Sequence, residues 1–235
     1  MNKGKLYLIP SPLSECDAAE VIPGPVLELL QHIKTYVVEE ERTVRRYLSK
    51  AGLKGHIDEL HFETLNEHTK PEEVEKLISL FNDGNDVGLI SESGLPAVAD
   101  PGATLVALCH VHGIEVRPCV GPSSLMLALM GSGLNGQSFA FRGYLPAKTD
   151  LRRAALKDAE SLSGKLNQTQ IFIETPYRSD ALLTDMANCL APSTQICIAA
   201  NLTSENQLIR TKTAAEWKKA PLSIGKTPCV FLILK

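Results

Sequence analysis

A repeated change of pattern constrains the fold most strongly: a short apolar run, then a polar loop rich in proline and glycine, then a helix. Residues 87–102 give the clearest example, since their first four residues are mainly apolar and Ser91 begins a run of small and polar residues. The helical pattern of residues 103–112 follows and ends at Gly113. An open parallel sheet builds a ligand crevice at its carboxyl edge from this succession. The same residues also fit a loop that only connects a strand to a helix.

The remaining elements predict a protein of the α/β class. The first half alternates strands and helices, which favours a mostly parallel sheet with helical crossovers. Residues 206–210 form a strand pattern with no helix before it, so we expect a hairpin and a mixed sheet in the second half. A boundary near residues 117–121 gives two α/β domains, residues 1–117 and 118–235. The expected strands are residues 5–9, 36–38, 56–64, 87–90, 114–118, 139–141, 170–173, 195–199, 206–210 and 229–234, and the expected helices are residues 25–33, 43–51, 72–81, 103–112, 125–130, 151–163, 178–190 and 213–219.

Composition excludes several classes of protein. No apolar run approaches the roughly 20 residues of a membrane span, and the first five residues lack the apolar region of a signal peptide. The six cysteines form no C-x-x-C pair, which favours small buried residues of a reducing compartment over disulfides or metal ligands. We therefore expect a cytoplasmic protein without a membrane segment or a metal site. Because the formal net charge is -3, binding to nucleic acid would need a local basic patch.

One predicted helix carries a candidate for that patch. Arg42, Arg45, Arg46 and Lys50 fall at i, i+3, i+4 and i+8, on one face. These side chains could contact RNA phosphates. The same pattern is also typical of a solvent-exposed helix face whose cations pair with the nearby glutamates.

Two further loops have local interpretations. Ser123 is placed to cap the helix of residues 125–130, whose free N–H groups suit an anionic or polar ligand group, although any capped helix shows the same residues. Asp100 is expected to fix its own loop and to cap the helix after Pro101.

Five segments, taken in order, resemble those of the tetrapyrrole-methylase-like (class III) S-adenosylmethionine-dependent methyltransferases, and within them the ribosomal RNA small subunit methyltransferase I family. That family has a threonine-proline loop after its first strand, an S-D-A-G-T-P…D-P-G stretch, a P-G-P turn, a G-F-L-P-A-K segment and an F-Y-E-S…R segment. The matching segments here are residues 9–13 (IPSPL), 91–102 (SESGLPAVADPG), 118–124 (PCVGPSS), 143–148 (GYLPAK) and 172–178 (FIETPYR).

The resemblance implies two α/β domains with the cofactor in the cleft between them, in a homodimer. It implies S-adenosyl-L-methionine as donor, with S-adenosyl-L-homocysteine as product. The acceptor would be a cytidine ribose 2'-hydroxyl in 16S rRNA, so rRNA or the 30S subunit is the expected partner. Two alternatives stay open: a tetrapyrrole methyltransferase of the precorrin or uroporphyrinogen type, and a divergent member that binds cofactor or RNA without catalysis.

The resemblance and the chemistry of the residue types together give candidate site residues. A ribose hydroxyl is a poor nucleophile, so a base or a group that stabilises the developing alkoxide is expected. Candidates for that role are Glu39, Arg42 and Lys148, which fit phosphate binding or mutual pairing as well. Candidate phosphate contacts, besides Arg42 and Lys148, are Arg45, Arg46, Arg152, Arg153 and Arg178. Candidate donor contacts are Pro10, Ser91, Glu92, Ser93, Gly94, Leu95, Val98, Gly121, Ser123, Ser124, Ile173 and Leu202.

The chain departs from the family pattern at several positions. The acidic S-D-A-G has Glu92 in place of its aspartate, which keeps the charge with one more methylene. The late R-E-L-T has Ala200 and Asn201 in place of its two charged residues, and a G-E before the last strand is replaced by Thr227 and Pro228. The donor side therefore looks retained and the acceptor side partly rewritten.

Overall fold

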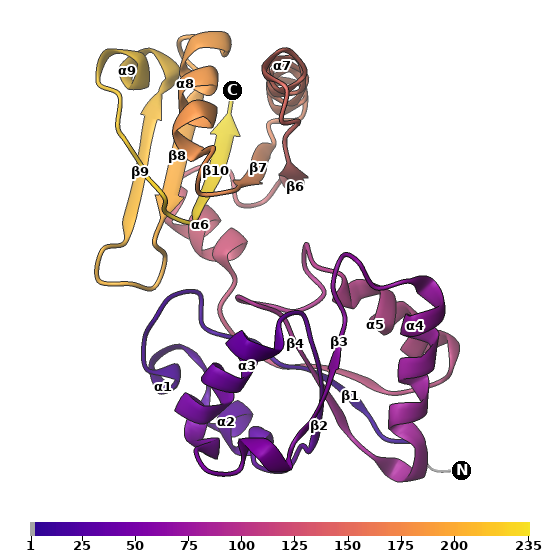
Figure 1. Ribbon diagram of the computed structural model, residues 1–235. Coiled ribbons are helices and arrows are strands. Elements are labelled where there is room, and N and C mark those ends of the chain that lie inside the picture. Colours follow the sequence, from indigo (N-terminus) through magenta and orange to yellow (C-terminus); the bar gives the residue numbers. More distant parts are fainter. Residues whose placement is uncertain (1–2) are drawn as a thin grey trace. The chain divides into compact units, whose positions relative to one another are not determined.

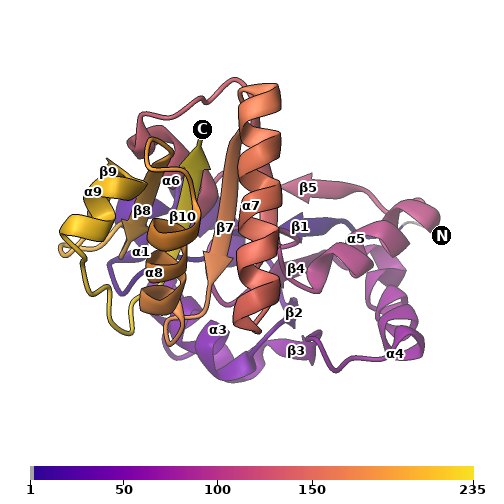
Figure 2. The ribbon, with the colours of Figure 1, turned by 90° about the horizontal axis from the view of Figure 1, so that it is seen from above.

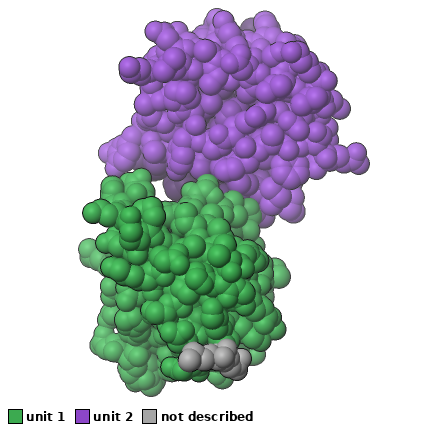
Figure 3. All heavy atoms as spheres, turned by 90° about the vertical axis from the view of Figure 1, so that its right-hand side faces the viewer, with its two compact units in different colours: residues 1–123 green, residues 124–235 purple. Residues whose placement is uncertain are grey.

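The computed structural model describes residues 3–235 and divides the chain into two compact units, residues 1–123 and 124–235 (Figure 3). The division falls a few residues after the boundary placed at residue 117. Each unit contains a five-stranded sheet covered by helices, so each has a core of its own.

The sheet of the first unit has the strand order β3-β2-β4-β1-β5, and all of its pairings are parallel. β2 and β4 are buried at every residue, as strands covered by helices on both faces must be. The predicted mostly parallel sheet is confirmed. The strands are β1 (Leu6–Leu8), β2 (Thr35–Val38), β3 (His61–Thr64), β4 (Val87–Ile90) and β5 (Val116–Pro118).

Helices cover both faces of this sheet (Figure 1). One core packs α1 (Ala18–Val21), α2 (Gly24–Leu30) and α3 (Glu41–Leu48) around Tyr36, and the other packs α4 (Pro71–Lys76) and α5 (Gly102–Val111) around Phe81. Three short helical turns extend these elements: η1 (Ser49–Leu53), η2 (Ile57–Glu59) and η3 (Leu77–Gly84).

The strand order creates one place where a ligand crevice is expected. β1 and β4 are neighbours, yet the chain leaves β1 toward β2 on one side and leaves β4 toward β5 on the other. The helices that follow the two strands therefore cover opposite faces of the sheet. Ligands of open α/β sheets bind at such a switch point.

The sheet of the second unit is mixed, with the order β6-β7-β10-β8-β9. β6 and β7 are parallel, whereas β10 runs antiparallel to β7 and β8, and β9 runs antiparallel to β8. The hairpin expected near residues 206–210 is confirmed, although its second strand begins two residues later than expected. The strands are β6 (Phe139–Tyr144), β7 (Thr169–Glu174), β8 (Gln195–Ala200), β9 (Leu208–Thr213) and β10 (Cys229–Leu234).

The long helices of the second unit pack on one face of this sheet (Figure 2). Their shared core surrounds Trp217, Phe172 and Phe231, which are all buried. α6 contacts β8, β9 and β10, and Thr211 donates a hydrogen bond from Oγ1 to the Ser132 carbonyl of α6 at 2.6 Å. The helices are α6 (Ser124–Ser132), α7 (Thr149–Leu166), α8 (Ser179–Cys189) and α9 (Ala214–Lys219).

No helix among residues 3–235 is long and apolar enough to cross a membrane. All six cysteines are free, and three of them are buried.

Candidate functional site

Two loops meet at the switch point of the first sheet. Ser11, after β1, and Gly94, after β4, form an antiparallel bridge in which each backbone N–H donates to the other residue's carbonyl, at 2.9 and 3.1 Å. Gly94 has a φ of +77°, a conformation that glycine adopts without strain. The bridge therefore holds both loops in a defined position at the carboxyl edge of the sheet.

The Ser91 hydroxyl is unusual among the polar groups of this region, because it is buried without a hydrogen-bond partner among the described residues. Ser91 is only 5% exposed, and its Oγ has no hydrogen-bond partner among the residues that the structure describes. Its carbonyl, in contrast, accepts from the Ser11 hydroxyl at 3.3 Å. Because leaving a buried hydroxyl unpaired costs about 1–3 kcal/mol, a ligand group is the natural partner for Ser91 Oγ.

Asp100 fixes the second half of the same loop, as the sequence predicts. Its Oδ1 accepts from the backbone N–H of Gly102 at 2.7 Å, at the start of α5, and from that of Ala97 at 3.0 Å. Burial raises the pKa of Asp100 above its ordinary value, although these amides oppose the shift. Ala97 and Ala99 both have a φ of +64°, which is costly for a residue with a Cβ. Strained backbone of this kind persists where the surroundings fix it, as in ligand-binding loops.

The loops after β1 and β5 approach each other closely at Gly121. A Cβ at this position would lie 2.2 Å from Pro10 Cβ, so only glycine permits the approach. Pro10 is buried, and its carbonyl accepts a hydrogen bond at 3.0 Å from the hydroxyl of Tyr47 on α3. Pro10, Gly94 and Gly121 thus belong to one cluster of loops, with Ser91 beside it.

Glu39 follows β2 and joins this cluster. Its Oε2 accepts from the backbone N–H of Glu92 at 3.3 Å. Burial raises the pKa of Glu39 above its ordinary value; the Glu92 amide opposes this shift, and the charges of Glu92, Asp100 and Glu67 add to it. A carboxylate with a raised pKa beside a ligand crevice can accept a proton more readily than an ordinary glutamate.

The basic face of α3 is only partly available to a ligand. Arg45 forms ion pairs with Glu41, at 3.4 Å, and with Asp58, and its guanidinium lies 5.5 Å from the Phe62 ring centroid. The alternative of a face paired with local acids therefore holds for Arg45. The side chains of Arg42, Arg46 and Lys50 are exposed.

In the second unit, Arg152 is buried rather than exposed. It is 6% exposed, donates to Asp185 Oδ2 from Nε at 2.8 Å and from Nη2 at 2.5 Å, and donates to the Ala147 carbonyl at 2.9 Å. The prediction that Arg152 contacts phosphate is wrong, because its guanidinium is enclosed by these partners. Arg152 instead anchors the loop that leads to Lys148, whose side chain is exposed.

Two other predicted phosphate contacts also pair internally. Arg178 forms a bidentate pair with the buried carboxylate of Glu174, with Nη2 at 2.6 and 2.7 Å from its two oxygens. Arg153 donates from Nε to Asp185 Oδ1 at 2.8 Å, while its side chain stays 47% exposed. Arg153 is therefore open to a further anion, whereas Arg178 serves first to fix its own loop.

The remaining predicted donor contacts are spread over both units. Leu95 is half-buried, and Glu92, Ser93 and Val98 are exposed. Ser124 is the first residue of α6, and Ser123 precedes it. Ile173 is a half-buried residue of β7, and Leu202 is 6% exposed in the turn after β8. That turn brings together two departures from the family pattern, since the Asn201 N–H donates to the Pro228 carbonyl at 3.2 Å.

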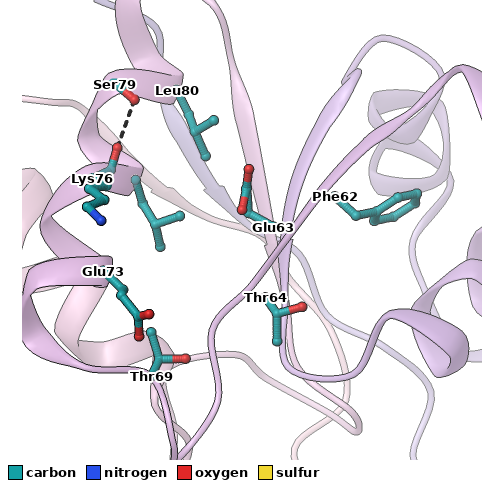
Figure 4. A pocket seen from close by; sticks show the side chains of 9 residues that line it. Phe62, Glu63, Thr64, Thr69, Glu73, Lys76, Ser79 and Leu80 are labelled. Atoms are coloured by element: carbon teal, nitrogen blue, oxygen red, sulfur yellow. Dashed lines mark hydrogen bonds between the residues drawn. The ribbon is translucent and has the colours of Figure 1, made fainter.

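The first unit also has a pocket away from these loops (Figure 4). It has a volume of about 550 Å³ and lies between the edge strand β3 and the helical segment of α4 and η3, with Glu63, Glu73 and Lys76 in its lining. None of the predicted site residues lines it. The residues that the structure describes include no cluster of three or more His, Cys, Asp or Glu side chains able to hold a metal ion.

Sequence reasoning missed three contributors to the loop cluster. Ser11 and Tyr47 act through contacts to residues distant in sequence, and Ala97 acts through its backbone conformation. The proline-serine alternation at residues 10–14 marks a stiff loop, but no signal identifies Ser11 or Tyr47 individually.

The chain is similar to known proteins over most of its length. The family model described as tetrapyrrole (corrin/porphyrin) methylases matches residues 16–218. A protein of Escherichia coli O157:H7 named ribosomal RNA small subunit methyltransferase I is 30% identical over 99% of this chain and 78% of its own length. A Pseudomonas aeruginosa protein of the same name is also 30% identical, over 99% and 79% of the two chains. The solved structure of uroporphyrin-III C-methyltransferase from Thermus thermophilus, complexed with S-adenosylhomocysteine, superposes with a TM-score of 0.61 at 16% identity and covers 99% and 98%.

Proposed function

Because the chain belongs to the family of tetrapyrrole (corrin/porphyrin) methylases, we propose that it transfers a methyl group from S-adenosylmethionine to a ribose 2'-hydroxyl of 16S rRNA. Membership of that family makes the protein a methyltransferase. The acceptor rests on two relatives that are both named ribosomal RNA small subunit methyltransferases. The LPAK segment at residues 145–148 supports RNA over a tetrapyrrole.

The buried Ser91 hydroxyl is the observation that carries the donor half of the proposal. It lies at the switch point of a parallel sheet and lacks a partner among the described residues, so a polar atom of the donor would satisfy it. The neighbouring backbone N–H and carbonyl groups suit the adenosine and methionine parts, and Glu92 suits a ribose hydroxyl or the ammonium group. Gly94, Gly121 and Pro10 keep these groups in place.

The proposed chemistry asks little of the protein beyond positioning. When bound, S-adenosylmethionine supplies a methyl group already activated by the sulfonium. Holding the acceptor oxygen in line with that methyl group can contribute about 7 kcal/mol or more to rate acceleration. Glu39 is the proposed proton acceptor for the ribose hydroxyl, because its raised pKa brings its basicity closer to the working pH.

Exposed cations are the proposed contacts to RNA phosphates: Arg42 and Arg46 on α3, and Lys148 and Arg153 at the start of α7. Arg45 and Arg178 would contribute by holding their own segments, since acids already pair with their guanidinium groups. We also propose that the protein is cytoplasmic and that it forms a homodimer. Sedimentation of the purified protein would test the homodimer.

Methyl transfer to purified acceptors tests the proposal. 30S subunits and naked 16S rRNA from cells that lack the protein would be incubated with labelled donor, and the modified nucleotide mapped by mass spectrometry. We expect one 2'-O-methylated ribose, absent from the rRNA of the deleted strain. Glu39→Gln should keep donor binding and lose transfer.

Two results would redirect the proposal. Donor binding with no label in either RNA preparation, but with label in uroporphyrinogen or a precorrin, would assign the protein to tetrapyrrole methylation. Binding of S-adenosylhomocysteine with no turnover on any acceptor would support a member that has lost catalysis.

A further inference from the structure

We propose that Tyr177 and Lys226 form a stacking platform for an unpaired base of the RNA acceptor, which rests on RNA being the proposed acceptor. Tyr177 is 79% exposed, the largest exposed fraction among the large hydrophobic residues of the described chain. The Nζ of Lys226 lies 5.3 Å from the centroid of its ring, over one face. An exposed aromatic ring with a cation on one face offers its other face to a nucleobase.

The ring is held on a rigid loop. Glu174 accepts from Nη2 of Arg178 with both oxygens and from the backbone N–H of Thr175 at 2.7 Å, while the Arg178 N–H donates to the Thr175 carbonyl at 2.9 Å. Pro176 restricts the backbone further. Tyr177 therefore has little backbone freedom to lose when a base stacks on it, which favours binding.

A separate set of bonds holds Lys226 beside this ring. Asp180, in the first turn of α8, accepts from the Ser223 hydroxyl at 2.8 Å and from the backbone N–H groups of Ile224 at 2.6 Å and Gly225 at 3.3 Å. Burial opposes ionisation of Asp180, yet these donors keep its pKa below the ordinary value. The segment that ends in Lys226 is thus tied to the helix that follows Tyr177.

The loop that carries Lys148 reaches the same end of the unit. Arg178 Nη2 donates to the Leu145 carbonyl at 3.4 Å, which joins the loop after β6 to the loop after β7. Lys148 and Lys226 are both exposed. Cations that contact phosphates and an aromatic ring that stacks on a base are the two components of single-strand binding. The contacts within this unit support both.

A role in stability does not explain the pair. An exposed cation–π contact contributes only about 0.5–1 kcal/mol. The chain also contains the same contact on a buried ring, in which Lys212 Nζ lies 5.0 Å from the ring centroid of Trp217. Trp217 is 1% exposed and donates from its indole N–H to the Ile196 carbonyl at 2.9 Å. That ring belongs to the core, whereas the Tyr177 ring lies in solvent.

Binding of two short fluorescent oligoribonucleotides, without methyl donor, tests the platform. One carries uracil at every position, and the other has the same backbone with abasic riboses. Tyr177→Ala should weaken binding to the uracil strand about tenfold, which corresponds to 1.4 kcal/mol, and leave the abasic strand unaffected. Tyr177→Phe should bind both strands as the parent does.

The lysine is tested by the salt dependence of the same binding. Lys226→Ala should lower the slope of log K against log salt by about 0.7, the contribution of one phosphate contact in a single strand. Lys212→Ala removes the same charge beside the buried ring and should leave the slope unchanged.

Three outcomes would overturn the platform. Tyr177→Ala could bind the uracil strand as tightly as the parent, or could lose affinity for both strands equally. It could also change the sedimentation of the protein with unaltered RNA affinity, which would assign the ring to a protein interface. The proposed function fails by a different result, the absence of methyl transfer to rRNA, so each proposal can fail alone.

Discussion

Replacement of Gly121 by alanine tests whether the loop cluster of the first unit binds the donor. The new Cβ would lie 2.2 Å from Cβ and 2.3 Å from Cγ of Pro10. Since real Cβ atoms essentially never approach closer than 3.0 Å, one loop must move by at least about 0.8 Å. Overpacking of this kind costs about 1–3 kcal/mol. The loop after β1 resists the movement, because the Ser11–Gly94 bridge and the Tyr47 hydroxyl both hold it.

The assay is calorimetric binding of S-adenosylhomocysteine, with thermal unfolding measured in parallel. We expect the Kd of Gly121→Ala to rise at least about tenfold, which needs only about 1.4 kcal/mol of the distortion to appear in binding. Gly24→Ala is the matched control, because nothing lies within 4 Å of the Cβ it would add at the start of α2. The Gly24→Ala variant should bind like the parent. A Gly121→Ala protein that unfolds at a lower temperature but binds with the parent's Kd would refute the placement of the donor in this cluster.

Three further predictions concern single side chains. Ser91→Ala should raise the Kd of S-adenosylhomocysteine up to about tenfold without lowering the unfolding temperature, because its hydroxyl has no protein partner to lose; an unchanged Kd in calorimetry would leave that hydroxyl unexplained. Folding raises the pKa of Glu39, so between its unfolded-state pKa and its higher folded-state pKa the native state binds more protons than the unfolded state does. Stability therefore falls as pH rises through that window. Glu39→Gln should remove that slope from urea unfolding measured across pH, and kcat/KM of the parent protein should fall as acid protonates Glu39. Arg152→Ala should destabilise the protein by about 3 kcal/mol in urea unfolding because it breaks a buried pair with Asp185, whereas the half-exposed Arg153→Ala should cost below about 1 kcal/mol; equal losses would contradict the assigned burial.

The sequence identifies the Ser91 loop because the apolar pattern stops where burial alone would continue it. Asp100 is predicted for a local reason as well, the fixing of its own loop, and the structure confirms this with bonds to the amides of Ala97 and Gly102. Ser11 is different. Its importance depends on β4 lying beside β1, and strand order is a property of the whole sheet that no local pattern encodes.

Arg152 shows where residue type misleads. Its spacing from Leu156 and Ala159 places it on the buried face of α7, whereas a charged residue is ordinarily assigned to the surface. The carboxylate that makes burial possible is Asp185, which lies on another helix. Similarly, Arg45 pairs with Asp58, thirteen residues away. Partners distant in sequence decide whether a cation is available to RNA, and the structure is needed to find them.

The two late departures from the family pattern are adjacent in the folded chain. Ala200 pairs with Cys229 across β8 and β10, and the Asn201 N–H donates to the Pro228 carbonyl. Asn201 has a φ of +50°, a conformation that asparagine tolerates better than most residues.

If charged residues had been lost from only one of the two strands, their charged partners on the other strand would be left unpaired beside the buried residue Leu202. Unpaired charges near a buried residue are costly. In this chain the substituted positions on both strands carry uncharged residues, so the substitutions on the two strands match each other. This consistency argues against loss of catalysis as the reason for the substitutions. We therefore expect the protein to transfer a methyl group to an acceptor.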